Sequence, residues 1–131
     1  MPEIIFKNLR MSVSSDANEH LLSLCVESGF MSYEVTISLS EKDVEVIKSN
    51  SERASFLQAA FHHPFQLKKS HLSIFEQRQY LDTILHSSKN IVEQFLTKMD
   101  HGSANGAVSN MLRITCGRDP EKLRKGQWFD K

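Results

Sequence analysis

Cys116 is the residue whose side chain and neighbours best suit covalent chemistry. Gly117 and Arg118 follow it, and a nearby guanidinium would stabilise the reactive thiolate of an exposed cysteine. The phosphate-binding loop of cysteine phosphatases needs arginine six positions after the cysteine, where this chain has Lys122. Catalysis by Cys116 and Arg118 would therefore need a histidine, brought near by folding, to activate the sulfur. Packing as a small apolar side chain is the simpler interpretation of this cysteine.

The six histidines are the second feature with chemical potential. His62, His63, His71 and His86 fall within 25 residues, and His62 or His63 is the candidate base of a small enzyme. A zinc site needs three or four converging ligands, commonly supplied by pairs at i and i+3 or i+4. No His or Cys pair has that spacing, so we predict no metal site. Nucleotide-binding glycine loops are absent as well, and no cofactor is predicted.

The C-terminal third combines cations with the ring pair Trp128-Phe129. As anchors in a pocket of a protein partner, the rings would bind beside Lys122, Arg124 and Lys125. The competing interpretation is a tail that folds back onto the core. Stacking on unpaired bases would instead make a nucleic-acid surface, but a pI near 7.0 disfavours it. The cations of this third are Arg113, Arg118, Lys122, Arg124, Lys125 and Lys131.

Charge is unevenly distributed along a chain of 131 residues that is neutral overall. Residues 1–65 carry a net charge of −4 and residues 66–131 one of +4, an asymmetry that can steer a partner. Hydrophobic residues at 40% and charged residues at 24% fit a single globular domain over residues 1–131. Two cysteines, no signal-peptide pattern and no long apolar run predict a soluble cytoplasmic protein without a membrane partner.

Residues 70–99 are the element around which the other elements are expected to pack. Apolar side chains recur there every three or four residues from Ile74 to Met99, which predicts one long amphipathic helix. Asn90 with Glu93 is an alternative start for a second helix, but a break usually resets the apolar phase. The outer face of this helix would suit an acidic partner or a second copy of the chain. It carries Lys68, Lys69, Gln77, Arg78, Lys89 and Lys98.

Alternating apolar side chains predict three strands, at residues 3–13, 33–39 and 108–116. A slip of phase in the first strand predicts a bulge near Asn8, and a helix competes for the third. Capping residues and apolar faces predict helical segments at 16–29, 40–48, 51–63 and 120–125. The first of these depends on Asp16 with Glu19 as a capping pair, and Pro64 is expected to end the third.

These elements predict an α+β fold with a small three-stranded, mostly antiparallel sheet packed on one face by helices. An all-α fold is the alternative if residues 3–13 and 108–116 are not strands. The favoured function is a non-enzymatic protein-interaction module of the inhibitor, immunity, antitoxin or adaptor type. A homodimer is a further expectation. The alternatives are a small enzyme using Cys116 or a clustered histidine with Arg118, and a nucleic-acid-binding protein.

Overall fold

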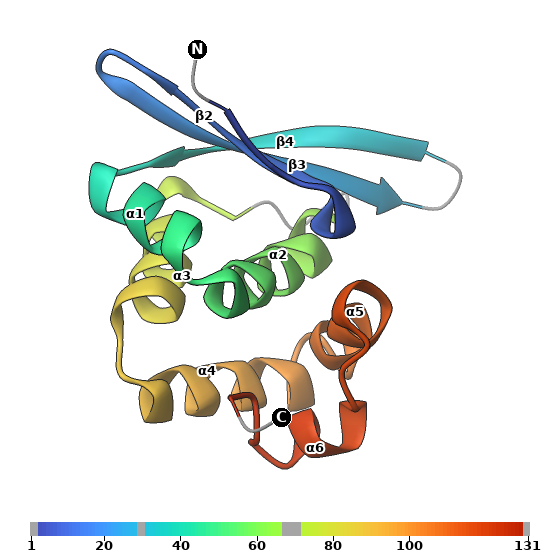
Figure 1. Cartoon of the computed structure of the whole chain (residues 1–131). Coiled ribbons are helices and arrows are strands. Elements are labelled where there is room, and N and C mark those ends of the chain that lie inside the picture. The colour runs from blue at the N-terminus through green and yellow to red at the C-terminus, as the bar shows by residue number, and fades with distance from the viewer. Residues whose placement is uncertain (1–2, 29–30, 67–71, 130–131) are drawn as a thin grey trace.

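The computed structural model describes residues 3–28, 31–66 and 72–129. The strands are β1 (Glu3–Phe6), β2 (Met11–Asp16), β3 (Glu19–Ser28) and β4 (Met31–Leu39). The helices are α1 (Glu41–Ser49), α2 (Ser51–Gln66), α3 (Ile74–His86), α4 (Lys89–His101), α5 (Ala107–Cys116) and α6 (Pro120–Arg124). The strands form an antiparallel sheet in the order β1-β2-β3-β4, and the helices lie against one of its faces (Figure 1). The predicted α+β class is confirmed, with four strands in place of three.

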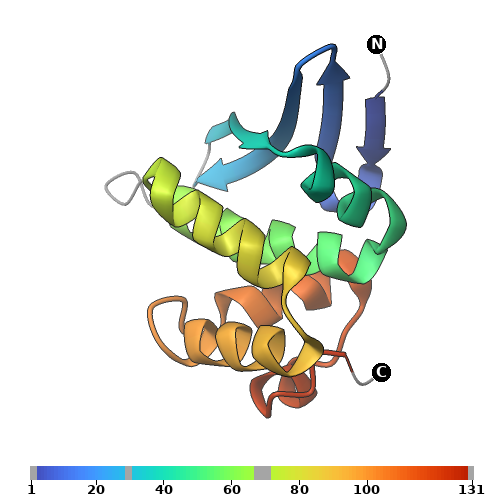
Figure 2. The same cartoon turned by 90° about the vertical axis from the view of Figure 1, so that its left-hand side faces the viewer.

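The chain is arranged in three layers (Figure 2). Helices α1 to α3 lie directly under the sheet, and α4 to α6 lie on their far side. Helix α2 packs against β3 on one side and α3 and α5 on the other, so it occupies the centre. Its side chains Phe56, Leu57 and Phe61 are fully buried, and each contributes about 1.5–3 kcal/mol of burial free energy. Among the described helices, none is long and apolar enough to cross a bilayer.

The first predicted strand is two strands. The short 3-10 helix η1 (Lys7–Leu9) and Arg10, with a left-handed φ of 51°, reverse the chain between β1 and β2. The slip of phase near Asn8 therefore marks a turn, and the predicted bulge is wrong. Side chains alternate between the two faces of the sheet within each of the two strands. Ile4 of β1 pairs with Val13 of β2 on the inner face of the sheet.

The predicted helix at residues 16–29 is also wrong, because residues 19–28 form β3. Asp16 and Glu19 pair across the end of a hairpin instead of capping a helix, and the Asp16 carboxylate accepts from the backbone N–H of Ala17 at 2.7 Å. Leu22 and Leu24 point to the inner face and are fully buried. Their spacing of two residues is the strand period.

Helix α1 begins as predicted. Ser40 and Asp43 form a reciprocal capping box at its start. Pro64 does not end α2, which continues to Gln66 and so corrects that prediction. Pro64 has no N–H to donate within the helix, and its ring crowds the carbonyl one turn before it, but burial of Phe65 favours the last turn.

The single helix expected over residues 70–99 is wrong, because α3 and α4 are separated at Ser87 and Ser88. Ser88 caps α4 through a hydrogen bond from the Ile91 N–H, so the start predicted at Asn90 is displaced by two residues. Arg53 of α2 donates to the carbonyl oxygens of Ile84 and Ser87 at 3.0 and 2.8 Å. These contacts satisfy the open end of α3.

The strand predicted at residues 108–116 is wrong, and the competing helix is found there as α5. Val108 and Leu112, four residues apart, are fully buried on one helical face. Gly106 before the helix and Gly117 after it have φ of 89° and 66°, which favour glycine. Helix α6 begins at Pro120 as predicted.

Candidate functional site

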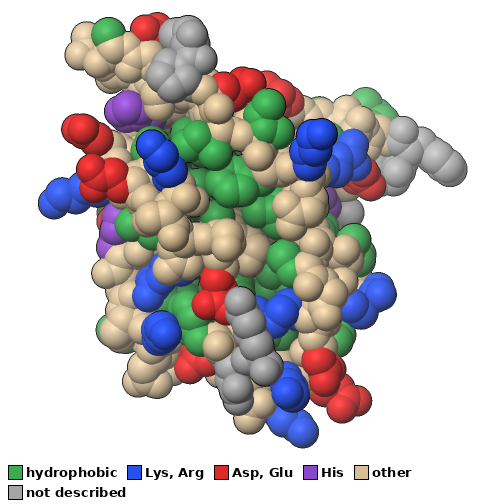
Figure 3. All heavy atoms as spheres, viewed as in Figure 1, with side chains coloured by type: hydrophobic (Ala, Val, Ile, Leu, Met, Phe, Trp, Pro, Cys, Tyr) green, Lys and Arg blue, Asp and Glu red, His purple; other side chains and the backbone are tan. Residues whose placement is uncertain are grey.

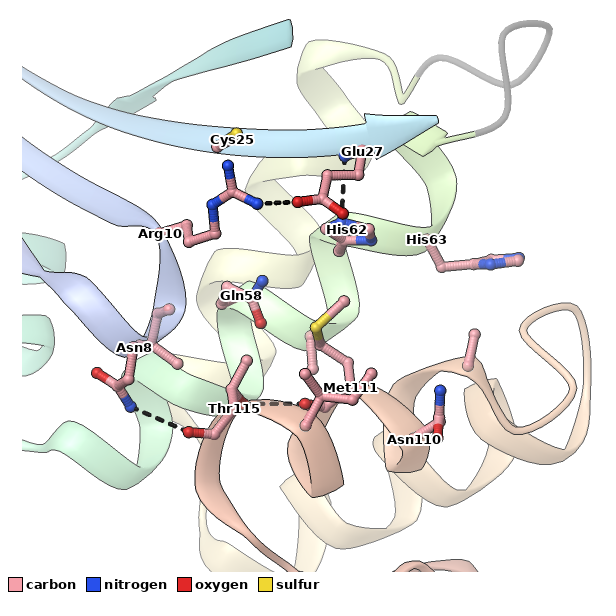
Figure 4. A pocket seen from close by; sticks show the side chains of 14 residues that line it. Asn8, Arg10, Cys25, Glu27, Gln58, His62, His63, Asn110, Met111 and Thr115 are labelled. Carbon is pink, nitrogen blue, oxygen red and sulfur yellow. Dashed lines mark hydrogen bonds and ion pairs between the residues drawn. The ribbon is translucent and has the colours of Figure 1, made fainter. Parts of the chain in front are cut away.

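A cavity of about 340 Å³ lies between the end of the sheet and helix α5 (Figure 4). Four parts of the chain form its wall: the turn before β2, the last residues of β3, the second half of α2 and one face of α5. Small-molecule sites in proteins span roughly 300 to 1,000 Å³. The volume therefore suits a small ligand.

Gln58 contributes the polar atom that distinguishes this cavity. Its side chain lines the cavity and is 3% exposed. The side-chain oxygen Oε1 is buried and accepts no hydrogen bond from any residue that the structure describes. An unpaired buried acceptor costs about 1–3 kcal/mol.

His62, one helical turn further along α2, forms the neighbouring part of the wall. Its side chain is buried, and its Nε2 accepts from the backbone N–H of Glu27 at 3.4 Å. Burial lowers the pKa of His62, and the nearby charges of His63 and Arg10 lower it further. The imidazole is therefore neutral at pH 7, with its proton on Nδ1 because Nε2 is the acceptor.

Arg10 and Glu27 form an ion pair at the opening of the cavity. Both side chains are 56% exposed, so the pair adds little to stability. The positive charge of Arg10 and the negative charge of Glu27 nevertheless neutralise each other at the opening of the cavity. Cys25 and His63 also border the site, but Figure 4 shows the Cys25 sulfur on the other side of β3 and the His63 ring directed outward.

The rest of the wall is mostly apolar. Leu9 and Ala59 are buried behind it, and α5 supplies Ala107, Met111 and Ile114. These side chains can pack against the body of a ligand, and the thioether of Met111 suits contact with an aromatic ring.

A hydrogen bond ties the turn before β2 to α5. Asn8 Nδ2 donates to the backbone oxygen of Thr115 at 3.4 Å. The Thr115 hydroxyl donates to the Met111 carbonyl oxygen at 2.9 Å, so it is held within its own helix. No hydroxyl or thiol of the described residues hydrogen-bonds to His62. Among the described residues that line this cavity, no hydroxyl or thiol is therefore paired with a histidine base.

The predicted catalytic residues do not meet in this cavity. His62 and His63 border it, whereas Cys116 and Arg118 border a separate hollow of about 260 Å³. No histidine is among the described residues around that hollow. Arg118 donates to the Trp128 carbonyl oxygen and lies 3.8 Å from Glu52, so its guanidinium is engaged within the fold. His71 lies outside the described residues.

The aromatic anchor predicted at the C-terminus is wrong for Trp128, whose side chain is fully buried. Its ring meets Phe56 edge to face at 6.0 Å, and Nε1 donates to the Thr97 hydroxyl at 2.8 Å. Phe129 is partly buried and also packs on Phe56, at 5.1 Å. The competing interpretation, a tail folded onto the core, describes both rings.

The basic residues predicted around the rings are only partly available. Arg124 forms an ion pair with the fully buried Asp100 at 3.2 Å, while Lys122 and Lys125 are exposed. Figure 3 shows Lys and Arg side chains dispersed among Asp and Glu on the face that it displays. In the predicted basic face of residues 70–99, Arg78 is paired internally with Asp43, and Lys68 and Lys69 lie outside the described residues.

A second polar cluster joins α1 to α3. Single ligand atoms of Asp43, Asp82 and His86 lie within 4.8 Å of one another. Arg78 fills this cluster, donating to both oxygens of Asp43 at 2.8 and 2.7 Å. A guanidinium in that position takes the place that a cation would need. The arrangement is a structural ion-pair network.

Searches for similarity give no relative to guide this interpretation. Neither the protein-family models, nor the curated proteins, nor the solved structures contain a match to this chain. The functional argument therefore depends on the cavity and its residues.

Proposed function

We propose that this protein is a non-enzymatic binding module that holds a small molecule in the cavity between β3, α2 and α5. The observation that carries the proposal is the cavity of about 340 Å³, whose wall includes the buried side chain of Gln58, an amide with no hydrogen-bond partner among the described residues. Buried polar groups in folded proteins almost always have a partner. A side-chain amide without a partner in the wall of a cavity of ligand size is explained by a ligand that hydrogen-bonds to it.

The test is binding of small fragments to the full chain, followed by amide shifts in two-dimensional NMR. Neutral aromatic fragments of about ten non-hydrogen atoms are expected to bind in the millimolar range, with the largest shifts around Gln58 and Met111. Ala107→Leu, which places a larger side chain in the wall, should abolish those shifts. Ala17→Leu, the same substitution in the β2–β3 turn, should leave them unchanged. Shifts scattered over the surface, or none, would contradict the proposal.

Gln58→Leu should make the free protein more stable by about 1 kcal/mol, because it removes the unpaired acceptor while keeping an apolar side chain in the wall. Urea denaturation measures the change. Gln94→Leu on the exposed face of α4 is the matched control, and its effect should stay within about 0.5 kcal/mol. A loss of stability in Gln58→Leu would mean that Oε1 already has a partner in the free protein.

Protein recognition, the function favoured by the sequence, is a second proposal with its own observation. Ile74 and Phe75 at the start of α3 are 83% and 81% exposed, although Ile74 begins the apolar face that was expected in the core. Neighbouring apolar side chains this exposed are typical of contact surfaces. A purified partner that bound wild-type protein and the double variant Ile74→Ser, Phe75→Ser equally would exclude this surface.

A further inference from the structure

We propose that the ligand of this cavity is a small uncharged molecule with a carbonyl group, whose oxygen accepts hydrogen bonds from the side chains of Gln58 and His62. This inference rests on the proposed binding function and adds the chemical class of the ligand. Three properties of the wall support it: two free N–H donors on neighbouring turns of α2, few free acceptors, and no net charge at the opening.

The end of the Gln58 side chain that a ligand can reach is its nitrogen. Oε1 has almost no accessible surface, whereas Nε2 is not closed off in the same way and hydrogen-bonds to no described residue. Figure 4 shows this nitrogen on the side of Arg10 and His62. The nitrogen of a side-chain amide donates and does not accept. Gln58 therefore offers an N–H group to the cavity.

His62 supplies a second donor one helical turn along α2. Its Nε2 accepts from the backbone N–H of Glu27 at 3.4 Å, so the ring proton is on Nδ1. No described residue accepts from that Nδ1. Residues four apart on a helix lie on the same face, with about 5–6 Å between their Cβ atoms. Two N–H groups at this spacing suit the two lone pairs of one carbonyl oxygen.

The oxygen atoms around the cavity give a ligand few groups to donate to. Asn110 Oδ1 accepts from Arg113 Nε at 3.0 Å, and the carboxylate of Glu27 is paired with Arg10. Figure 4 shows the side-chain oxygen of Asn8 directed away from the cavity. The free hydrogen-bonding groups of the wall are therefore mainly donors. A ligand without an acceptor would displace solvent from these donors and leave them without partners.

The charges at the opening favour an uncharged ligand. Arg10 and Glu27 form an ion pair, and burial lowers the pKa of His62, so its imidazole is neutral at pH 7. Cys25 and His63 are the other titratable residues around the cavity, and their side chains turn away from it in Figure 4. Helix α5 contributes no titratable group among its described lining residues. A carboxylate would lose its hydration without gaining an unpaired cation, and a neutral carbonyl loses far less.

The apolar part of the wall suits a compact hydrocarbon body attached to that carbonyl. Ala59, Ala107 and Ile114 provide aliphatic surface, and Met111 adds a sulfur atom of the kind that contacts ring edges favourably. Acetophenone combines an aromatic ring with a carbonyl oxygen and has no N–H or O–H group. It therefore serves as the probe that accepts hydrogen bonds and cannot donate them.

The experiment compares four probes on the full chain by NMR titration at pH 7. 2-Phenylpropene has nearly the shape of acetophenone but carries a methylene group in place of the oxygen. Indole donates an N–H and has no carbonyl, and benzoate carries a negative charge. Acetophenone should shift the amides around Gln58 and should bind more tightly than indole or benzoate.

Two further measurements assign the donors. In Gln58→Leu, acetophenone should lose about fivefold in affinity while 2-phenylpropene loses none, because only the carbonyl probe loses a hydrogen bond. Gln94→Leu, on the exposed face of α4, should leave both affinities unchanged. In the unaltered protein, the resonance of the His62 Nδ1 nitrogen should shift on binding of acetophenone and should move much less with 2-phenylpropene.

The outcomes distinguish the ligand class from the binding function. If indole binds more tightly than acetophenone, or if Gln58→Leu weakens acetophenone and 2-phenylpropene alike, the carbonyl class is overturned while the cavity remains a binding site. Preference for benzoate would overturn the uncharged class in the same way. If neither these probes nor the neutral fragments shift the amides around Gln58, the proposed function itself fails.

Discussion

Asp43→Ala is expected to lower the free energy of unfolding by about 3 kcal/mol. The carboxylate is fully buried and accepts from Arg78, His86 and the Ser40 N–H at 2.7–2.8 Å. Alanine removes the capping box of α1 and the link between α1 and α3, and leaves the Arg78 charge without its main partner. Urea denaturation with a constant slope gives the change directly.

The matched control is Asp82→Ala. Asp82 pairs with the same Arg78 from the next turn of α3, but its side chain is 61% exposed. An exposed ion pair of this kind contributes little to stability, so Asp82→Ala should lower the free energy of unfolding by less than about 1 kcal/mol. Equal losses in the two variants would show that the buried network has no special role.

The same carboxylate sets a pH dependence. Burial opposes ionisation of Asp43, but hydrogen bonds from Arg78, Ser40 and His86 outweigh it and lower the pKa from 3.8 to about 2. The native state therefore binds this proton less readily than the unfolded state. The lowered pKa of Asp43 adds about 2 kcal/mol to the free energy of unfolding above pH 3.8, and this stabilisation is lost as the pH falls towards 2. In acid denaturation of the Asp43→Asn variant, the free energy of unfolding should not show this loss between pH 3.8 and 2.

Sequence patterns predicted the elements that depend on local chemistry. The Ser40 capping residue, the alternation over Tyr33–Leu39 and the proline at the start of α6 each involve neighbours within a few residues. The helix predicted from the spacing of Asp16 and Glu19 was wrong because two acidic residues three apart also occur at the end of a hairpin. The spacing of Leu22 and Leu24 was the stronger signal for β3.

The break between α3 and α4 depends on a distant residue. Arg53 satisfies carbonyl oxygens at the end of α3, and no pattern within residues 70–99 contains that information. The apolar phase runs across Ser87 and Ser88 because both helices pack on the same core. Periodicity therefore predicted the buried face of these residues better than their number of helices.

The cavity could not be predicted from the sequence because the residues that line it are far apart along the chain. Arg10, Glu27, Gln58 and Met111 span a hundred residues and meet only through the packing of β3, α2 and α5. One local signal existed: Gln58 stands between Leu57 and Ala59 in the apolar stretch of α2. A polar side chain on such a stretch indicates a special environment, but not which segment faces it.

Trp128→Ala is expected to lower the free energy of unfolding by about 3–5 kcal/mol, the range for removal of a buried large aromatic side chain. The indole ring is fully buried, packs edge to face on Phe56 and donates to the Thr97 hydroxyl. Because Thr97 lies in α4 and Phe56 in α2, the ring fixes the end of the chain to two helices. Thermal or urea denaturation measures the loss.

Two further variants separate packing from the hydrogen bond in this contact. Trp128→Phe keeps an aromatic ring but loses the Nε1 donor, while the Thr97 hydroxyl still donates to the Glu93 carbonyl oxygen. An intermediate loss of about 1–3 kcal/mol in the free energy of unfolding is therefore expected. Gln127→Ala, at the exposed neighbouring position, should change stability by no more than about 0.5 kcal/mol. If Trp128→Ala behaved like Gln127→Ala, the ring would not be part of the core. Its role as an anchor for a protein partner would then regain its support.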